Sequence, residues 1–410
     1  MKLLHPASSL VLLTFVAGCA APVARPEAGA HIEHIEPSEA TGTSVATVVE
    51  DIPLAHTDQF YAFGRNGDVV GVGDLEAQVR QVLHNIQTAL RLVGSDLRDL
   101  AKLNVYLAES ISVDQVTRLL PAVLPAGSHP AVSFVCLELP YPDALVAADA
   151  VAVARGGQDA VSFYRSDSLY SPDGQASVGF LPAGPKVYVS GQAEPGHLTE
   201  GAARTMVSLH ATLAYLGLSA GDVVQVKAFV NTMADADSVE AKIGEYYRNR
   251  PAPPVVVTEW REDSLPAEIE LIASARRAGR RAARGSGDVI SYVTPPGMAS
   301  SPVFSRVARV NRGRLIFVSG LHAAGKDVES QIRAVFDKLE RVLREAGSDF
   351  NHLVKATYYH STDEAGSVLN DVRRELYDPQ RPPAASKIRV RGVGFEDATI
   401  SMDMIAVVAR

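Results

Sequence analysis

The chain of 410 residues has only two cysteines, one tryptophan and 6% aromatic residues, and its formal net charge is −8. Without an excess of positive charge it lacks the field that attracts nucleic acid, and with so few aromatic side chains it lacks a surface on which bases stack. Its 47% hydrophobic and 21% charged residues are typical of a globular protein. We therefore expect folded domains and no nucleic-acid partner.

The common signatures of nucleotide, metal and hydrolase sites are also missing. The sequence has no P-loop, no His/Cys metal cluster and no Gly-x-Ser-x-Gly nucleophile elbow. His31–Glu36 holds two histidines that could share a metal ion on a helix, but Pro37 follows directly, which favours a solvated linker. Residues 19–50, which contain this segment, are predicted to form a flexible tether. We expect no metal site and no cofactor.

The N-terminal residues have the order of a bacterial lipoprotein signal. The apolar run Leu10–Phe15 is too short for a membrane-spanning helix, which needs about 20 residues. Val16-Ala17-Gly18-Cys19 follows and resembles a lipobox, so residues 1–18 are predicted to be a signal peptide and Cys19 to carry lipid. Ala20 after the cysteine favours an anchor in the outer membrane facing the periplasm. An ordinary secretory signal or a short buried helix is the alternative.

A short apolar run that ends in glycine recurs along the chain. The clear copies are Val187–Gln192 and Ile316–Gly320, and Phe60–Gly64 is a more divergent copy. Each is typical of a strand that stops where the backbone needs room. Gly64, Gly191 and Gly320 are 127 and 129 residues apart, and so regular a period indicates three tandem copies of one unit.

The elements that follow each run also repeat. An amphipathic helix comes first, with apolar residues spaced i, i+3, i+7 and i+10, and it stops at a glycine. A strand, a second helix, a Pro-Ala hinge and two strands complete the unit, which predicts an α+β fold with both helices on one face of the sheet. The predicted boundaries are 51–155 for the first repeat, 160–276 for the second, 277–288 for an Arg-rich linker and 289–410 for the third.

These motifs resemble the RidA/YjgF family of enamine/imine deaminases. The resemblance rests on Val187–Gln192, Pro251-Ala252 and Glu268–Ala273 in the second repeat, and on Phe317–Gly320 and Met402–Ala406 in the third. The first repeat matches weakly. The resemblance implies chorismate-mutase-like α+β sandwiches and a trimer with small-molecule pockets at its interfaces. Three units on one chain therefore predict a monomeric, intramolecular pseudo-trimer. Because its units are covalently linked, it would not dissociate on dilution.

The resemblance also implies an arginine after the Pro-Ala hinge that binds the substrate carboxylate, and this chain lacks it. The matching positions are Val132, Ala385, and either Pro253 or, in a shifted register, Val255. Phe304 stands where the family has a pocket tyrosine. Because strand residues two apart share a face, we predict that Lys387 and Arg389 replace the arginine beside Ala385; a solvent-facing charged ladder is the alternative.

At other positions of the implied site, this chain has residues of the same chemical type as the family. Asp149, Glu270 and Asp403 match the acidic position that holds the attacking water, and these carboxylates are the candidate catalytic residues; a structural role is the alternative. The candidate substrate-binding residues are Ser190, Gly191, Ser319, Gly320, Lys387 and Arg389.

The sequence therefore predicts a protein that binds a small carbonyl or anionic metabolite at clefts between its repeats, with the deaminase chemistry weak or lost. An active enamine/imine deaminase that releases ammonia from 2-imino acids is one alternative. A scaffold or interaction protein of the cell envelope is another.

Overall fold

The computed structural model describes residues 31–156, 158–171, 175–248, 251–262, 264–276 and 287–409. Cys19 and the predicted signal peptide lie outside these residues, as do residues 277–286 of the Arg-rich linker. Within the described part, no helix combines the length and apolar character needed to cross a membrane.

The same succession of elements occurs three times, except that two short strands, β3 and β4, replace the single third strand in the first repeat. The first repeat contains β1 (Ile32–Ser38), β2 (Thr43–Val49), β3 (Leu54–Thr57), β4 (Phe60–Tyr61), α1 (Leu75–Arg91), β5 (Leu100–Leu107), α2 (Val113–Val123), β6 (Ala131–Cys136) and β7 (Val146–Val153). The second contains β8 (Ser162–Tyr164), β9 (Val178–Leu181), β10 (Lys186–Gln192), α3 (Leu198–Tyr215), β11 (Val223–Val230), α4 (Ala236–Glu245), β12 (Val255–Glu259) and β13 (Ala267–Ser274). The third contains β14 (Ile290–Val293), β15 (Val307–Val310), β16 (Leu315–Val318), α5 (Val328–Glu345), β17 (Leu353–His360), α6 (Asp363–Leu376), β18 (Ala384–Arg389) and β19 (Ile400–Val407).

The predicted helical stripes are buried, and the predicted glycines close the helices. In α5, for example, Ile332, Val335, Leu339 and Val342 are all inaccessible to solvent. The closing glycines Gly94, Gly217 and Gly347 have φ angles of 69°, 75° and 76°. Residues with a side chain adopt this left-handed conformation only at a cost in steric strain, so the glycine fixes the end of each helix.

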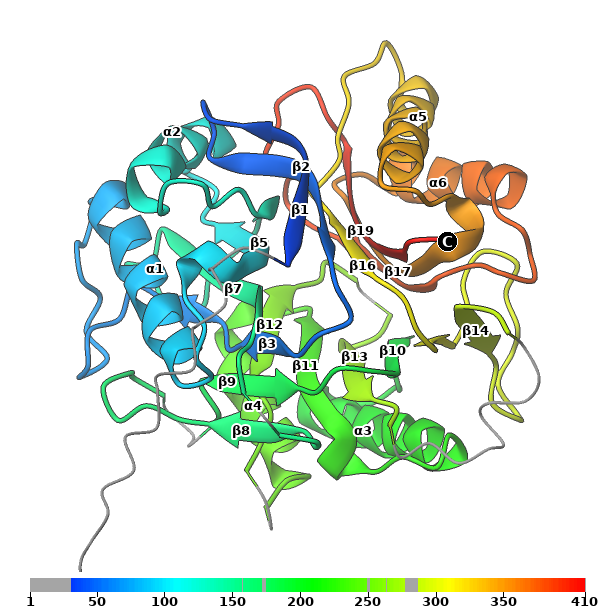
Figure 1. Cartoon of the computed structure of the whole chain (residues 1–410), viewed down its shortest axis with the longest axis horizontal. Coiled ribbons are helices and arrows are strands. Elements are labelled where there is room, and N and C mark those ends of the chain that lie inside the picture. The colour runs from blue at the N-terminus through cyan, green and yellow to red at the C-terminus, as the bar shows by residue number, and fades with distance from the viewer. Residues whose placement is uncertain are drawn as a thin grey trace, which may run out of the picture.

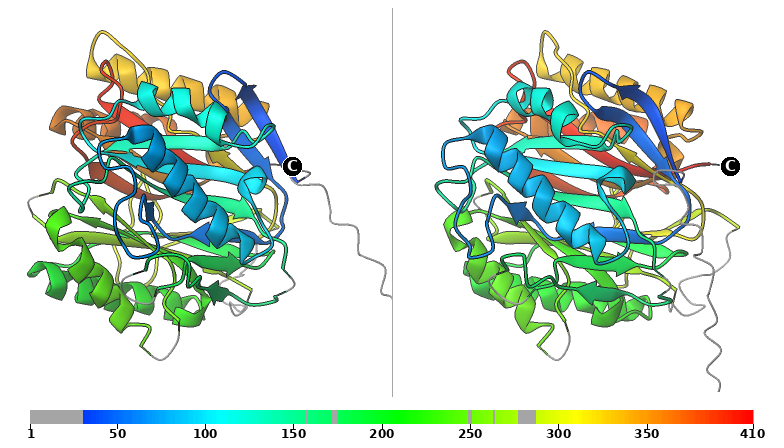
Figure 2. Two further views of the ribbon diagram at one scale, coloured as in Figure 1. Left: turned by 90° about the vertical axis from the view of Figure 1, so that its left-hand side faces the viewer. Right: turned by 60° about the vertical axis from the view of Figure 1, so that its left-hand side comes forward.

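The helices lie outside and the sheets lie inside (Figure 1). Each helix pair covers one face of its own sheet and builds a separate apolar core with it. The opposite sheet faces pack on one another in a further cluster that includes Val151, Tyr188 and Phe317, one residue from each repeat. The side views show the strands stacked between the outer helix layers (Figure 2). The predicted α+β repeats are thus confirmed, and in this structure they surround a common centre.

The hairpin that opens each repeat joins the sheet of a different repeat. β2 pairs with β16 of the third repeat, with Val48 opposite Ile316. β9 pairs with β3 of the first repeat, with Phe180 opposite Ala55. β15 pairs with β10 of the second repeat in the same antiparallel manner. The chain therefore crosses between sheets after every hairpin, which ties the three repeats together through backbone hydrogen bonds.

This exchange corrects the prediction of a flexible tether over residues 19–50 for its described part, residues 31–50. From Ile32 to Val49 the chain is a β-hairpin, and its apolar side chains Ile35, Ala46 and Val48 belong to the core of the third repeat. The solvent-facing charges and Pro37 of β1 hid the strand period from sequence reasoning. Over the described residues, no group of three or more His, Cys, Asp or Glu side chains is arranged to hold a metal ion.

Candidate functional site

Strand register identifies the equivalent position at the end of each central strand. Leu54, Lys186 and Leu315 each begin a central strand opposite the corresponding residue of β7, β13 or β19. Four residues further on lie Asp58, Ser190 and Ser319. The counterpart of Ser190-Gly191 and Ser319-Gly320 in the first repeat is therefore Asp58-Gln59, and the prediction that used Phe60–Gly64 was out of register. It failed because Asp58-Gln59 contains neither serine nor glycine.

These three strand-end residues make the same contact with a neighbouring repeat. The N–H of Ala385 donates to Ser190 Oγ at 2.7 Å, and the N–H of Val132 donates to Ser319 Oγ at 3.0 Å. The N–H of Val255 donates to Asp58 Oδ1 at 3.1 Å.

Val132, Val255 and Ala385 are the positions matched to the family arginine, and the contact selects Val255 over Pro253. Each strand end thus meets a former arginine position at a seam between two repeats, and a cleft lies at each seam.

The largest of these clefts, of about 750 Å³, lies between the second repeat and the hairpin of the third. We call it the Arg306 cleft. The second repeat contributes Gly191, Gln192, Thr212, Tyr215 and Glu268, and the third repeat contributes Pro295–Met298, Phe304 and Arg306. The predicted residue Gly191 therefore lines the cleft, and Ser190 stands directly behind it.

Glu268 is the carboxylate of the Arg306 cleft. It lies so close to Gly191 that a Cβ on that residue would come within 1.9 Å of Glu268 Oε1, so a larger residue there would force the Glu268 side chain to move. Glu268 Oε1 is buried and accepts no hydrogen bond from the described residues. Burial raises the pKa of Glu268 to about 7, although Ser386 acts in the opposite direction. A carboxyl group with this pKa can both give and take a proton near neutral pH.

The equivalent positions in the other repeats carry no acid. Taken from the same register, the counterparts of Glu268 are Ala147 in β7 and Ser401 in β19. Ser401 Oγ lies beside Gly320, as Glu268 lies beside Gly191. Of the three seams, only that of the Arg306 cleft has a carboxylate at this position.

Arg306 supplies a cation to the same cleft. Its guanidinium lies 5.0 Å from the centre of the Phe304 ring, and its Nε donates to the carbonyl of Ala299 at 3.1 Å. No carboxylate among the described residues lies within salt-bridge distance of it. Sequence reasoning missed Arg306 because it belongs to the exchanged hairpin, far along the chain from any Pro-Ala hinge.

The predicted replacements for the arginine lie elsewhere. Lys387 donates to the carbonyl of Gly366 at 3.3 Å, and burial lowers its pKa. Arg389 pairs with Asp363 at 2.9 Å. Neither residue lines the Arg306 cleft. Their shared strand face is turned toward α6, and their predicted binding of an anionic ligand beside Ala385 stays a prediction.

The three candidate catalytic acids meet at the centre of the molecule, away from the strand-end serines. Asp149, Glu270 and Asp403 line a central cavity of about 60 Å³ together with Lys102, Lys227 and Lys355. The ion pairs Lys355–Glu270 and Lys102–Asp403 measure 2.7 and 3.2 Å. Asp149 accepts from Tyr106 Oη at 2.6 Å and from Asn104 Nδ2 at 3.0 Å. These contacts favour the alternative interpretation, in which the acids are structural.

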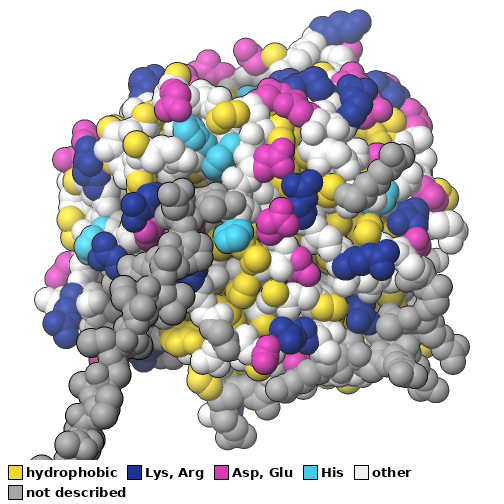
Figure 3. Space-filling view, in the orientation of Figure 1, with side chains coloured by type: hydrophobic (Ala, Val, Ile, Leu, Met, Phe, Trp, Pro, Cys, Tyr) yellow, Lys and Arg dark blue, Asp and Glu magenta, His cyan; other side chains and the backbone are white. Residues whose placement is uncertain are grey.

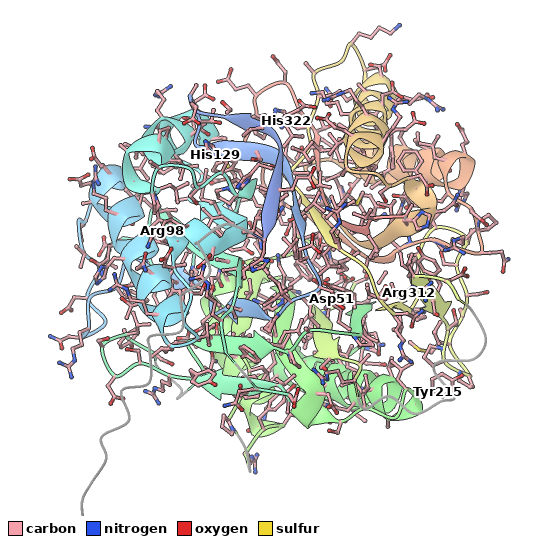
Figure 4. The ribbon with its side chains drawn as sticks, in the orientation of Figure 1. Asp51, Arg98, His129, Tyr215, Arg312 and His322 are labelled. Carbon is pink, nitrogen blue, oxygen red and sulfur yellow. The ribbon has the colours of Figure 1, made fainter. Side chains whose placement is uncertain are left out.

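The other two clefts differ from the first and from each other. The His322 cleft, of about 440 Å³, includes Ser319, Gly320, His322, Lys338 and Arg341. Its cations are engaged, because Lys338 donates to the carbonyl of His322 at 2.7 Å and Arg341 pairs with Glu36. Tyr215 and His322, which belong to the Arg306 and His322 clefts, lie on well separated parts of the molecule (Figure 4).

The Asp58 cleft is the smallest of the three, about 30 Å³, and its wall contains Asp58, Gln59, Tyr61, Tyr141 and Glu240. On the surface shown in Figure 3, acidic and basic side chains are interspersed. The charge differences among the clefts are those of the residues that line them.

Comparison with known proteins matches the three repeats one by one. The sequence model of the Endoribonuclease L-PSP family matches residues 54–154, 176–275 and 298–408. A Rid-family protein of unknown function, YyfB from Yersinia pestis, is 27% identical over 30% of this chain and 98% of its own, with a TM-score of 0.28. The YjgF gene product of E. coli is 25% identical over 23% of this chain and 83% of its own, with a TM-score of 0.22. Because the family model covers most of the chain, this protein belongs to the Endoribonuclease L-PSP family, the RidA/YjgF family of the resemblance above, and carries three tandem copies of its unit.

Proposed function

We propose that this protein binds a small metabolite with a carboxylate and a neighbouring carbonyl or imine group in the Arg306 cleft. The observation that carries the proposal is the meeting of Arg306 and Glu268, from two different repeats, in one cleft of about 750 Å³. A guanidinium binds a planar carboxylate through two parallel hydrogen bonds. Glu268 then faces the rest of the ligand with a group that can exchange a proton. Clefts of this size suit small organic ligands.

Replacing Arg306 by Gln is expected to weaken binding of 2-ketobutyrate by roughly tenfold or more, because a charge-assisted contact contributes about 1.5–3 kcal/mol. Isothermal titration calorimetry measures the change. Arg312→Gln is the matched control, since Arg312 lies just after the same hairpin and donates to the carbonyl of Gly287 outside the cleft. Equal affinities for the wild type and Arg306→Gln would rule out the guanidinium as the anion contact.

A second candidate function is hydrolytic deamination of 2-imino acids, and the raised pKa of Glu268 favours it. In this reaction water adds to the imine carbon and the C–N bond breaks, which releases ammonia and leaves a keto acid. The ionised Glu268 would accept a proton from the water, so the rate should rise with pH through about 7.

The assay follows ammonia released from freshly generated 2-iminobutyrate above the spontaneous rate. We expect Glu268→Gln to lower the catalysed rate by roughly a hundredfold. Glu200→Gln, which alters an exposed pair with Arg204 on α3, should leave it unchanged. Absence of any acceleration by the wild type would leave metabolite binding as the function, whereas an active Glu268→Gln variant would exclude Glu268 as the base.

A further inference from the structure

The strand end of the first repeat carries a carboxylate where the other two carry a hydroxyl. Asp58 occupies the position of Ser190 and Ser319 and accepts hydrogen bonds from the N–H groups of Val255 and Gln59. No lysine or arginine among the described residues lines the cleft around it. This seam has therefore lost the cationic character that Arg306 gives to the largest cleft.

Aromatic rings form the rest of the wall. The rings of Tyr61 and Tyr141 meet edge to face at 4.8 Å, and so do those of Phe63 and Tyr141. Tyr170, from the connection between β8 and β9 of the second repeat, meets Phe63 at 5.2 Å. The faces of such rings carry negative charge density and attract cations, most strongly where water is excluded.

Further carboxylates increase the negative potential at this seam. Glu240 of α4 lines the cleft, and Asp237 of the same helix lies 3.4 Å from Tyr141 Oη. Burial raises the pKa of Asp58 well above its ordinary value, and the charge of Glu240 raises it further. The same two effects, in the same order, raise the pKa of Tyr61. Burial is the larger cause in both groups and the charge of Glu240 the smaller one, and a bound cation would offset the repulsion between these negative charges.

An unsatisfied donor faces the same space. Gln59 is 8% exposed and its Oε1 accepts the N–H of Val257 at 3.0 Å. Its Nε2 is buried and finds no acceptor among the described residues. Because an unsatisfied buried donor is costly, this atom points to an oxygen supplied by a ligand.

We propose that the Asp58 cleft binds a small primary amine whose ammonium group is followed by a hydroxyl or carbonyl oxygen, such as an amino alcohol. The ammonium would lie against Asp58 and the rings of Tyr61 and Tyr141, and the oxygen would accept from Gln59 Nε2. The cleft of about 30 Å³ admits the ammonium group, since about 10–15 Å³ is enough to hold a water molecule, and a short chain places the oxygen at Gln59 Nε2.

This site is separate from the Arg306 cleft in its residues and in the sign of its charge. The chain would thus present one cleft for anions and another for cations at equivalent seams. A single chain allows this because each repeat can diverge, whereas identical subunits carry identical seams.

Calorimetric titration of the whole protein at neutral pH with ethanolamine hydrochloride tests the proposal. Ethylammonium chloride, which lacks the oxygen, should bind several-fold more weakly. Ethylene glycol, which has a hydroxyl in place of the ammonium, should not bind measurably. Equal heats from ethanolamine and ethylene glycol, or none from ethanolamine, would overturn the proposal.

The informative variant is Asp58→Ser, because serine at the equivalent positions accepts the same backbone N–H and should preserve the fold. We expect it to weaken ethanolamine binding at least about tenfold, with an unchanged melting temperature. Tyr141→Leu should also weaken it, whereas Arg306→Gln should have no effect on it. Unaltered ethanolamine affinity in a folded Asp58→Ser protein would overturn the assignment of this site.

Discussion

A chain that begins at residue 51 is expected not to fold into a stable, soluble monomer. The hairpin that it lacks lies before the first segment matched by the family model, but it is part of the folded core. The reason is that β1 and β2 complete the sheet of the third repeat. Ile35 and Val48 belong to its core, and Ile32 and Val49 belong to the central cluster. Burying a side chain of this size contributes about 1.5–3 kcal/mol, so four of them approach the entire stability of an ordinary domain.

Removal would also turn β16 into an exposed apolar edge strand, which invites pairing with another chain. Thermal unfolding by circular dichroism and size-exclusion chromatography measure both effects. The matched control begins at residue 31 and keeps the hairpin. If the shorter chain melted at the same temperature as the control and eluted as a monomer, the hairpin would be a dispensable tether after all.

Lys355→Met is expected to destabilise the protein by about 3–5 kcal/mol, because it leaves Glu270 buried without its partner. The pair crosses from the third repeat to the second, with both side chains under a tenth exposed. It therefore lies at the centre, where all three repeats meet.

Urea unfolding measures the loss in the free energy of unfolding. Two control variants show whether the buried charge is its cause. The double variant Lys355→Met, Glu270→Leu should recover most of the stability, since an apolar pair of similar volume avoids the cost of burying charge. Lys242→Met, which breaks an exposed pair with Glu245, should change stability by less than about 1 kcal/mol. A Lys355→Met protein as stable as the wild type would mean that the centre is open to water.

The sequence contained enough local information to predict the repeats and their helices. The apolar stripe from Ile332 to Val342 and the helix end at Gly347 depend only on residues close by in the sequence. Their period and spacing are visible without knowledge of the fold.

The pairing partner of each hairpin could not be predicted in this way. β2 and β16 pair although most of the chain separates them in sequence. Nothing in the residues Thr43–Val49 indicates which strand they pair with. The family resemblance alone gave no sign that the hairpins are exchanged.

The candidate site was predicted in outline only. Ser190, Gly191, Ser319 and Gly320 do lie at seams between repeats. Of the acids of β13, the predicted Glu270 lines the central cavity and Glu268 lines the Arg306 cleft. The two share one face of the strand, and only the packing of the three sheets decides which one lies at the boundary between repeats. Lys387 and Arg389 were chosen for strand parity, which says nothing about the neighbouring helix. Lipidation at Cys19 stays a prediction.

Small-angle X-ray scattering on the chain from residue 31, with its mass determined in the same experiment, tests most directly whether three repeats close around one centre within one chain. The account predicts the mass of a single chain and a radius of gyration of roughly 21 Å, as expected for a compact body of about 380 residues. A mass of three chains, or a single chain with a much larger radius and the profile of separated domains, would contradict it.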